Sequence, residues 1–208
     1  MRAGHSHSSR LRLTALIALA LVASLTSPAS AVSLFKYAPA TQWGYTYAGP
    51  ATSKTSTAAP KSANLEKVST INVNYNNFPD WAKKELQSAV DIWAANFSSK
   101  VPITIDATWS NSQSIAVLGS ARPGGYFAAF SGAPDASLWY PSALANALAG
   151  KDLDVRNAEM IINVNARASW NKRGDGSPST REYDLKSVFI HEMGHGLGFL
   201  STDSYDSF

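Results

Sequence analysis

The chain has 208 residues, with 18 Lys and Arg against 15 Asp and Glu, and it contains no cysteine. The lack of cysteine excludes disulfide bonds and zinc sites built on cysteine. With 45% hydrophobic and 16% charged residues, the composition is typical of a globular chain and not of a disordered one.

The first 31 residues have the three parts of a secretory signal peptide. Arg2, Arg10 and Arg12 give a basic start, residues 13–25 are an apolar run, and residues 29–31 (ASA) offer a cleavage site. The alternative is a membrane anchor, but the apolar run is shorter than the roughly 20 residues that span a bilayer. The sequence therefore predicts an extracellular protein with no stable membrane insertion after cleavage at residue 31.

Removal of the signal peptide changes the charge balance. Residues 1–31 contain three of the 18 basic residues and none of the 15 acidic ones, so the remaining chain carries 15 of each sign. A net charge of zero gives no support for binding to nucleic acid.

Residues 32–64 form a second region with an aromatic part and a linker. The aromatic part, residues 32–49, contains Phe35, Tyr37, Trp43, Tyr45 and Tyr47. Residues 49–64 are rich in Ser, Thr, Ala and Pro and are poor in large apolar residues, as linkers are. The aromatic part is either a short pro-segment or a strand that docks on the domain that follows.

The third region, residues 65–208, has the patterning of one folded domain. Alternation of apolar and polar residues predicts strands at 71–75 and 102–109, and apolar runs predict strands at 114–118 and 160–164. Residues 124–130 are expected to form a short edge strand, and a helix is expected to start at Pro79 and Asp80. This order of elements favours an α+β fold, or a three-layer α/β fold, with a mixed sheet.

The loop at residues 170–183 contains Arg173, Gly174 and Asp175, a tripeptide that some adhesion receptors recognise. The simpler interpretation is a tight turn around Gly174 and Gly176.

The last predicted helix carries the candidate chemistry. Asp184 can cap its start, and the sequence HEMGH occupies residues 191–195. Residues four apart on a helix lie about 40° apart around the axis and about 6 Å apart along it. His191 and His195 can therefore reach one Zn²⁺ ion, and Glu192 can serve as the general base for a water molecule.

Three observations argue against a chance occurrence of this pattern. His191 and His195 are the only histidines outside the signal peptide. Glu192 follows the apolar residues 188–190, where an unpaired carboxylate is costly. Glycines at 194, 196 and 198 each cost about 1 kcal/mol relative to alanine in a helix, so they indicate close packing or a sharp turn.

Residues 191–199, HEMGHGLGF, resemble the active-site helix of the metzincin clan of zinc peptidases. The HExxHxxGF form is similar to the leishmanolysin-like branch and to secreted proteins with the sequence HE-[LIM]-GHGLGF. The resemblance covers residues 65–199 in outline and implies a zincin-like N-terminal subdomain with a mixed twisted sheet, a backing helix and an active-site helix. It further implies that Gly198 ends the helix and turns the chain toward a third zinc ligand, and that an edge strand binds the peptide substrate.

The sequence departs from the clan pattern after Gly198. The usual third ligand would occupy position 201, which is Ser201, and no methionine follows for the clan's Met-turn. One explanation is that the chain is a fragment without its C-terminal subdomain. The other is that Asp203 or Asp206 completes the zinc site.

The sequence thus predicts a secreted, monomeric zinc metalloendopeptidase that acts on polypeptides. A binding or adhesion module with a decayed protease site and a zinc hydrolase of non-peptide substrates are the alternatives. Retention of both histidines and Glu192 argues against decay.

Overall fold

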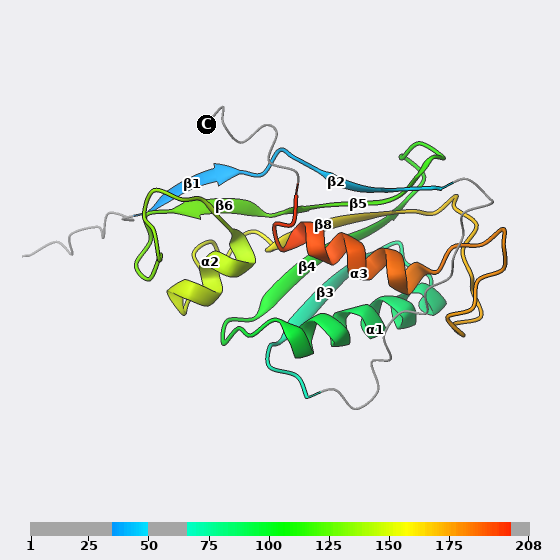
Figure 1. The fold of residues 1–208 in the computed structure, drawn as a ribbon, viewed down its shortest axis with the longest axis horizontal. Helices are drawn as coiled ribbons and strands as arrows, with labels where there is room; N and C mark the ends of the chain where they lie inside the picture. Colours follow the sequence, from blue (N-terminus) through cyan, green and yellow to red (C-terminus); the bar gives the residue numbers. More distant parts are fainter. Residues whose placement is uncertain (1–34, 50–65, 201–208) are drawn as a thin grey trace, which may run out of the picture. The chain divides into compact units, whose positions relative to one another are not determined.

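The computed structural model describes residues 35–49 and 66–200. The predicted signal peptide, the linker and the candidate ligands Asp203 and Asp206 lie outside these residues. Within the described parts of the chain, three helices accompany two β-sheets of five and three strands, compatible with an α+β class (Figure 1). No helix in these parts is long and apolar enough to cross a membrane.

The five-stranded sheet is mixed and has the order β2-β5-β8-β4-β3. Its strands are β2 (Gly44–Tyr47), β3 (Ile71–Asn76), β4 (Ile103–Ser110), β5 (Val117–Pro123) and β8 (Met160–Asn165). The strands β3, β4 and β8 are parallel, whereas β5 runs antiparallel to both β8 and β2. The strands predicted at 71–75, 102–109 and 160–164 are confirmed. The strand predicted at 114–118 starts later, because Val117 N donates to Ser114 O in a turn.

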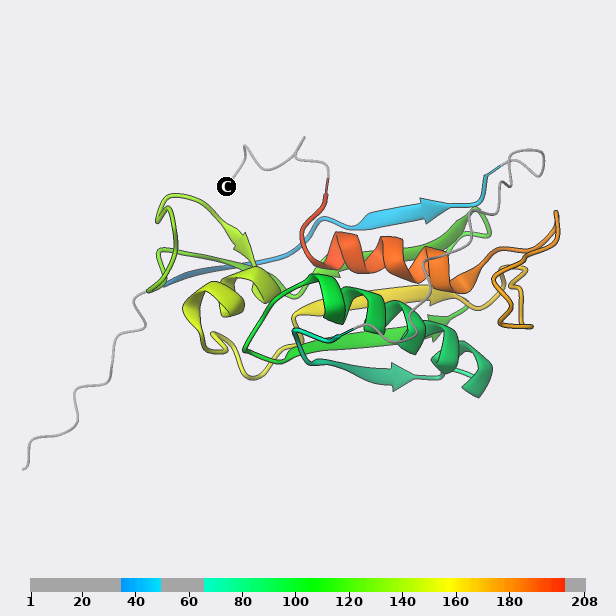
Figure 2. The same cartoon turned by 60° about the horizontal axis from the view of Figure 1, so that its bottom comes forward.

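Helices α1 (Asp80–Asn96) and α3 (Leu185–Gly196) pack side by side on one face of this sheet (Figure 2). The helix α1 begins after Pro79, as predicted. Trp93 Nε1 on α1 donates a 3.0 Å hydrogen bond to Ile190 O on α3, at a turn of α3 next to the HEMGH sequence. Both helices lie on the same face of the five-stranded sheet, and this arrangement is compatible with the α+β alternative.

The smaller sheet has the order β1-β6-β7, from β1 (Lys36–Pro39), β6 (Gly125–Ala128) and β7 (Tyr140–Pro141). The helix α2 (Ser142–Ala149) follows β7 directly, and Phe127, Phe130 and Ala145 form a small core there. The prediction that residues 124–130 form an edge strand is wrong, because β1 and β7 pair with both sides of β6.

The aromatic part of the second region supplies one strand to each sheet. The strand β1 pairs antiparallel with β6, and β2 pairs antiparallel with β5. The segment therefore docks on the domain as two strands, and its role as a pro-segment stays a prediction.

Candidate active site

The start of α3 is fixed by its cap. One carboxylate oxygen of Asp184 accepts hydrogen bonds from Ser187 N at 2.9 Å and from Ser187 Oγ at 2.6 Å. Such a cap stabilises a helix by about 1 kcal/mol. The fully buried side chains of Phe189 and Met193 belong to the main core, so the helix is held by its apolar face.

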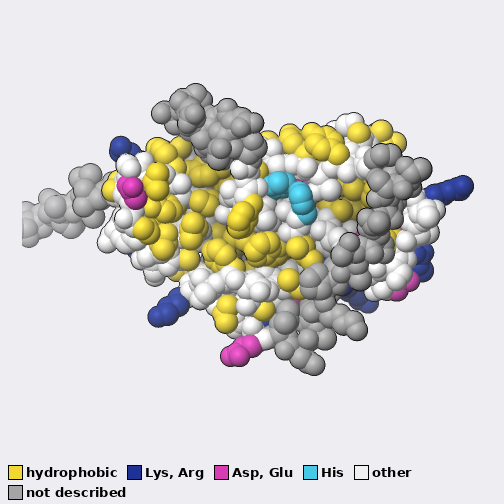
Figure 3. Space-filling model, viewed as in Figure 1, with side chains coloured by type: hydrophobic (Ala, Val, Ile, Leu, Met, Phe, Trp, Pro, Cys, Tyr) yellow, Lys and Arg dark blue, Asp and Glu magenta, His cyan; other side chains and the backbone are white. Residues whose placement is uncertain are grey.

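His191 and His195 lie one turn apart near the end of α3, as their spacing predicts. Their ring centroids are 4.5 Å apart and the rings are nearly perpendicular, at 86°. Burial, and then the neighbouring His195, lower the pKa of His191, which favours the neutral imidazole that binds metals. Histidine side chains are visible on the molecular surface, with apolar side chains close by (Figure 3).

The turn after α3 fixes the orientation of His195. The helix ends at Gly196, and Gly198 has a φ of 105°, in the left-handed region that favours glycine. This turn places the carbonyl oxygen of Phe199 2.7 Å from His195 Nδ1. A carbonyl oxygen can only accept, so Nδ1 carries the hydrogen and Nε2 of the neutral ring has a free lone pair. His195 Nε2 is buried and has no hydrogen-bond partner.

Glu192 lies on the buried side of the helix, with 0% of its surface exposed. Its Oε1 accepts a 2.6 Å hydrogen bond from Thr46 Oγ1 on β2, whereas its Oε2 is buried without a partner. Burial raises the pKa of this carboxyl to about 7, against the opposing effect of the Thr46 hydrogen bond. Gly119 on β5 leaves space for the Glu192 carboxylate, because a Cβ on residue 119 would lie 2.8 Å from Glu192 Oε1.

The strand β2 lies directly against this site. A Cβ on Gly44 would overlap the imidazole ring of His195, so only glycine fits at this position of the strand. Two residues later Thr46 reaches Glu192, since alternate residues of a strand share a face. Gly44, Thr46, Gly119 and the Phe199 carbonyl group were not identified from the sequence. The one signal available was the alternation of small and aromatic residues at 44–47 (GYTY).

The donors present suit a zinc ion in part. Two imidazoles, one of them with an unpaired Nε2, and a carboxylate with an unpaired oxygen are the kinds of group that bind Zn²⁺ and its water molecule. Within residues 35–49 and 66–200, however, no three His, Cys, Asp or Glu side chains are grouped closely enough to hold a metal. A third ligand would have to come from another part of the protein.

The Arg-Gly-Asp tripeptide is engaged within its own loop. Arg173 pairs with Asp175 at 3.2 Å and with Glu182 at 2.8 Å, and Asp175 also accepts a hydrogen bond from Asn171 at 2.7 Å. These contacts, with the φ of 70° at Gly174, form the predicted turn and occupy the side chains that an adhesion receptor would need.

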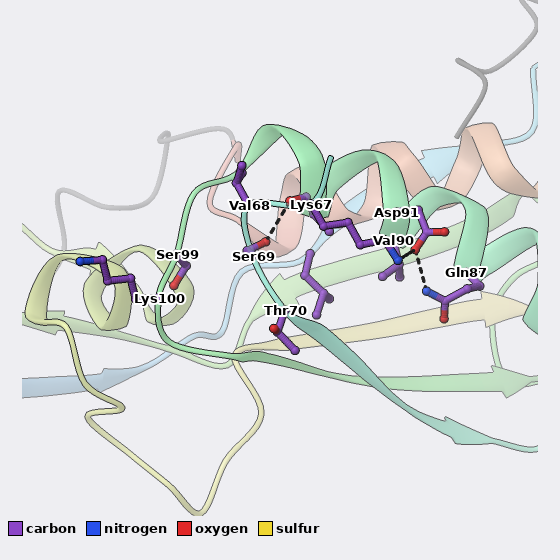
Figure 4. Close-up of a pocket in the computed structure, with 11 residues that line it drawn as sticks. Lys67, Val68, Ser69, Thr70, Gln87, Val90, Asp91, Ser99 and Lys100 are labelled. Atoms are coloured by element: carbon purple, nitrogen blue, oxygen red, sulfur yellow. Dashed lines mark hydrogen bonds and ion pairs between the residues drawn. The ribbon is translucent and has the colours of Figure 1, made fainter. Parts of the chain in front are cut away.

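One cavity lies away from the site, between α1 and the segment before β3, with a volume of about 490 Å³ (Figure 4). Its lining residues include Lys67 and Asp91, whose side chains form a 2.7 Å ion pair. A smaller cavity of about 240 Å³ lies beside His195 and is bordered by Trp43, Tyr45 and Tyr47. Of these two cavities, the smaller one adjoins His195.

Comparison with known proteins gives no match: no family model, no curated protein and no solved structure is similar to this chain. The geometry of the site and the resemblance of residues 191–199 are therefore the features that indicate a function.

Proposed function

We propose that this protein is a secreted zinc metalloendopeptidase. The observation that carries the proposal is His195, whose Nδ1 is held by the Phe199 carbonyl while its Nε2 is buried and unpaired. A backbone carbonyl on the second nitrogen is the usual support of a histidine that binds a metal. His191, one helical turn earlier, supplies the second ligand.

Glu192 suits the role of general base. A carboxyl with a pKa of about 7 can accept a proton from water at neutral pH and return it to the leaving nitrogen of a cleaved peptide bond. The chemistry that a bound zinc ion would supply is activation of that water molecule and polarisation of the peptide carbonyl.

The resemblance to the metzincin N-terminal subdomain belongs to this proposal. A mixed five-stranded sheet with a backing helix and an active-site helix on one face is compatible with it. The third zinc ligand is proposed to be Asp203 or Asp206, or a residue of a longer parent protein. The adhesion alternative is weaker, because Arg173 and Asp175 are paired with other side chains.

The first test is the zinc content of the secreted chain that starts at residue 32, beside the variants His195→Ala and His191→Ala. We expect about one zinc per chain, lost in both variants. Zinc at the same level in His195→Ala, or no zinc in any of the three at excess zinc, would overturn the metal assignment for this chain.

A second pair of variants tests the role of Glu192. Glu192→Gln is expected to keep zinc and lose at least 100-fold in peptide hydrolysis, in line with the contribution of a general base. Glu159→Gln is the matched control, because Glu159 is also a buried carboxyl but lies on the loop before β8. Equal losses in the two variants would contradict the assignment.

A further inference from the structure

Residues 35–48, here called the N-terminal strap, run along one continuous edge of the domain. The strands β5 and β6 follow each other with only Gly124 between them. The strap lies antiparallel to both, from Lys36 opposite Ala128 to Tyr47 opposite Val117. Both views show β1 and β2 beside β6 and β5 (Figures 1 and 2).

The strap contributes little to the core. Only Ala40 and Gly44 of its residues are buried, and Tyr47 is 63% exposed. No strap residue belongs to the buried part of the main core, whereas every residue of β5 except Arg122 is buried. The strap is therefore an outer layer, held by its backbone ladder and by a few side-chain contacts, such as that of Arg122 over the Trp43 ring at 5.0 Å.

The strap occupies the groups that the proposed reaction needs. Gly44 lies against the imidazole of His195, and the Thr46 hydroxyl donates to Glu192. With the strap in place, His195 Nε2 and Glu192 Oε2 are both buried, and the outer backbone edge of β5 is already paired. A polypeptide substrate could not pair with β5 or reach Glu192 without displacing β2.

We infer that the strap is an autoinhibitory segment that lies in the path of the substrate. This inference rests on the proposed function. Its release would leave a row of unpaired backbone groups on β5, the kind of edge that accepts an extended peptide. A peptide that pairs with β5 in place of the strap needs a glycine or similarly small residue opposite His195, as Gly44 is. It also needs a small residue with a hydroxyl group opposite Glu192, as Thr46 is. Cleavage in the linker that follows the strap would convert it from a tethered to a dissociable ligand, at a far lower effective concentration.

The experiment uses the full secreted chain with a recognition site for a specific protease inserted between residues 50 and 65. After cleavage and dilution we expect the strap peptide to dissociate, the circular dichroism of the remaining domain to be retained, and the β5 amides to exchange hydrogen faster. A fluorescent peptide of residues 35–48 should then bind the cleaved protein, and the uncleaved protein at least 10-fold more weakly.

Peptide variants test the contacts. Gly44→Val should weaken binding at least 10-fold, because its side chain would overlap His195, and Thr46→Val should weaken it about 10-fold through the lost hydrogen bond. Thr41→Val is the matched control, because Thr41 is exposed between β1 and β2 and does not line the cavity beside His195, so this change should stay within about 3-fold. Equal binding of all peptides would overturn the inference, and so would unfolding of the domain when the strap leaves.

These measurements need no metal, so they separate the two proposals. Zinc content and peptide hydrolysis are read on the same cleaved sample, where hydrolysis should rise at least 10-fold and fall again when the strap peptide is added. If zinc is absent while the peptides still discriminate, the metal assignment fails and the docking of the strap stands. If zinc is bound and hydrolysis does not change on release, autoinhibition is wrong and the peptidase assignment stands.

Discussion

Two glycines of α3, Gly194 and Gly196, are predicted to respond in opposite directions to the same substitution. Both have backbone angles that alanine adopts, and both are exchanged for alanine in the test. A Cβ on Gly194 would meet nothing closer than Trp93 Cζ2 at 3.8 Å, an ordinary contact. A Cβ on Gly196 would lie 2.8 Å from Met160 Sδ and 3.0 Å from its Cγ, and Met160 is fully buried in β8.

The expected magnitudes follow from these distances. Gly194→Ala removes the excess backbone freedom of glycine and should stabilise the protein by up to about 1 kcal/mol. Gly196→Ala gains less of this because Gly196 is the last residue of the helix. It also overpacks the core, which costs about 1–3 kcal/mol. We expect Gly196→Ala to be about 2 kcal/mol less stable than Gly194→Ala.

Equilibrium unfolding in urea gives the free energy of unfolding of the wild type and both variants under one set of conditions. Adding EDTA to every sample removes any contribution of bound metal. If Gly196→Ala were as stable as Gly194→Ala, the close approach of α3 to β8 would be wrong, and with it the explanation of why glycine stands at position 196.

Of three further predictions, two concern the surroundings of the site and one concerns a buried carboxyl away from it. Thr46→Val should lower the free energy of unfolding by about 1–2 kcal/mol, because the buried Glu192 carboxyl loses the hydroxyl that donates to it and keeps only the backbone hydrogen bond from the same residue. Thr46→Val should lower the free energy of unfolding by less when Glu192 is already replaced by Gln. Equal losses in the wild type and in Glu192→Gln, measured in a double-mutant cycle, would contradict the contact. Gly198→Ala should destabilise more than Gly176→Ala, since both glycines have positive φ but only Gly198 would also press on Pro141, at 2.7 Å; equal thermal midpoints would refute this. Burial raises the pKa of Glu159 in the folded protein above its unfolded value of 4.5. The contribution of this group to the free energy of unfolding is therefore fully present below pH 4.5 and is lost as the pH rises from there through the folded pKa. A ¹³C NMR titration with a midpoint at or below 4.5 would contradict it.

The elements that the sequence predicted well are those specified by local patterns. The alternation at 71–75 and the helix-start signals at Pro79 and Asp184 each involve only residues that are close in sequence. The strand and both helix starts could therefore be predicted from the sequence. The helix α2 was missed although its signals are local too. Its eight residues (SALANALA) are mostly strong helix formers, Pro141 precedes them, and Gly150 follows with a φ of 66°.

The position of the strap could not be predicted, because it depends on pairing across a long sequence distance. Thr46 and Glu192 are 146 residues apart, and no local pattern states which strand edge the GYTY sequence will join. The same limit explains the mistaken edge strand at 124–130. A short apolar strand has the same sequence pattern whether its two edges are paired or free. Here residues 36–39 pair with one edge of β6 and residues 140–141 pair with the other.

Gly198 shows how one residue can be identified correctly from the sequence and still hold a further role. The resemblance gives it the task of turning the chain toward a third ligand, which lies outside the described residues. Within them, the same turn brings the Phe199 carbonyl to His195 Nδ1 and so sets the tautomer of a proposed ligand. Because the glycine and the histidine are only three residues apart, this function is available to the chain whatever follows residue 200. The helix end thus prepares His195 for a metal independently of the group that would complete the site.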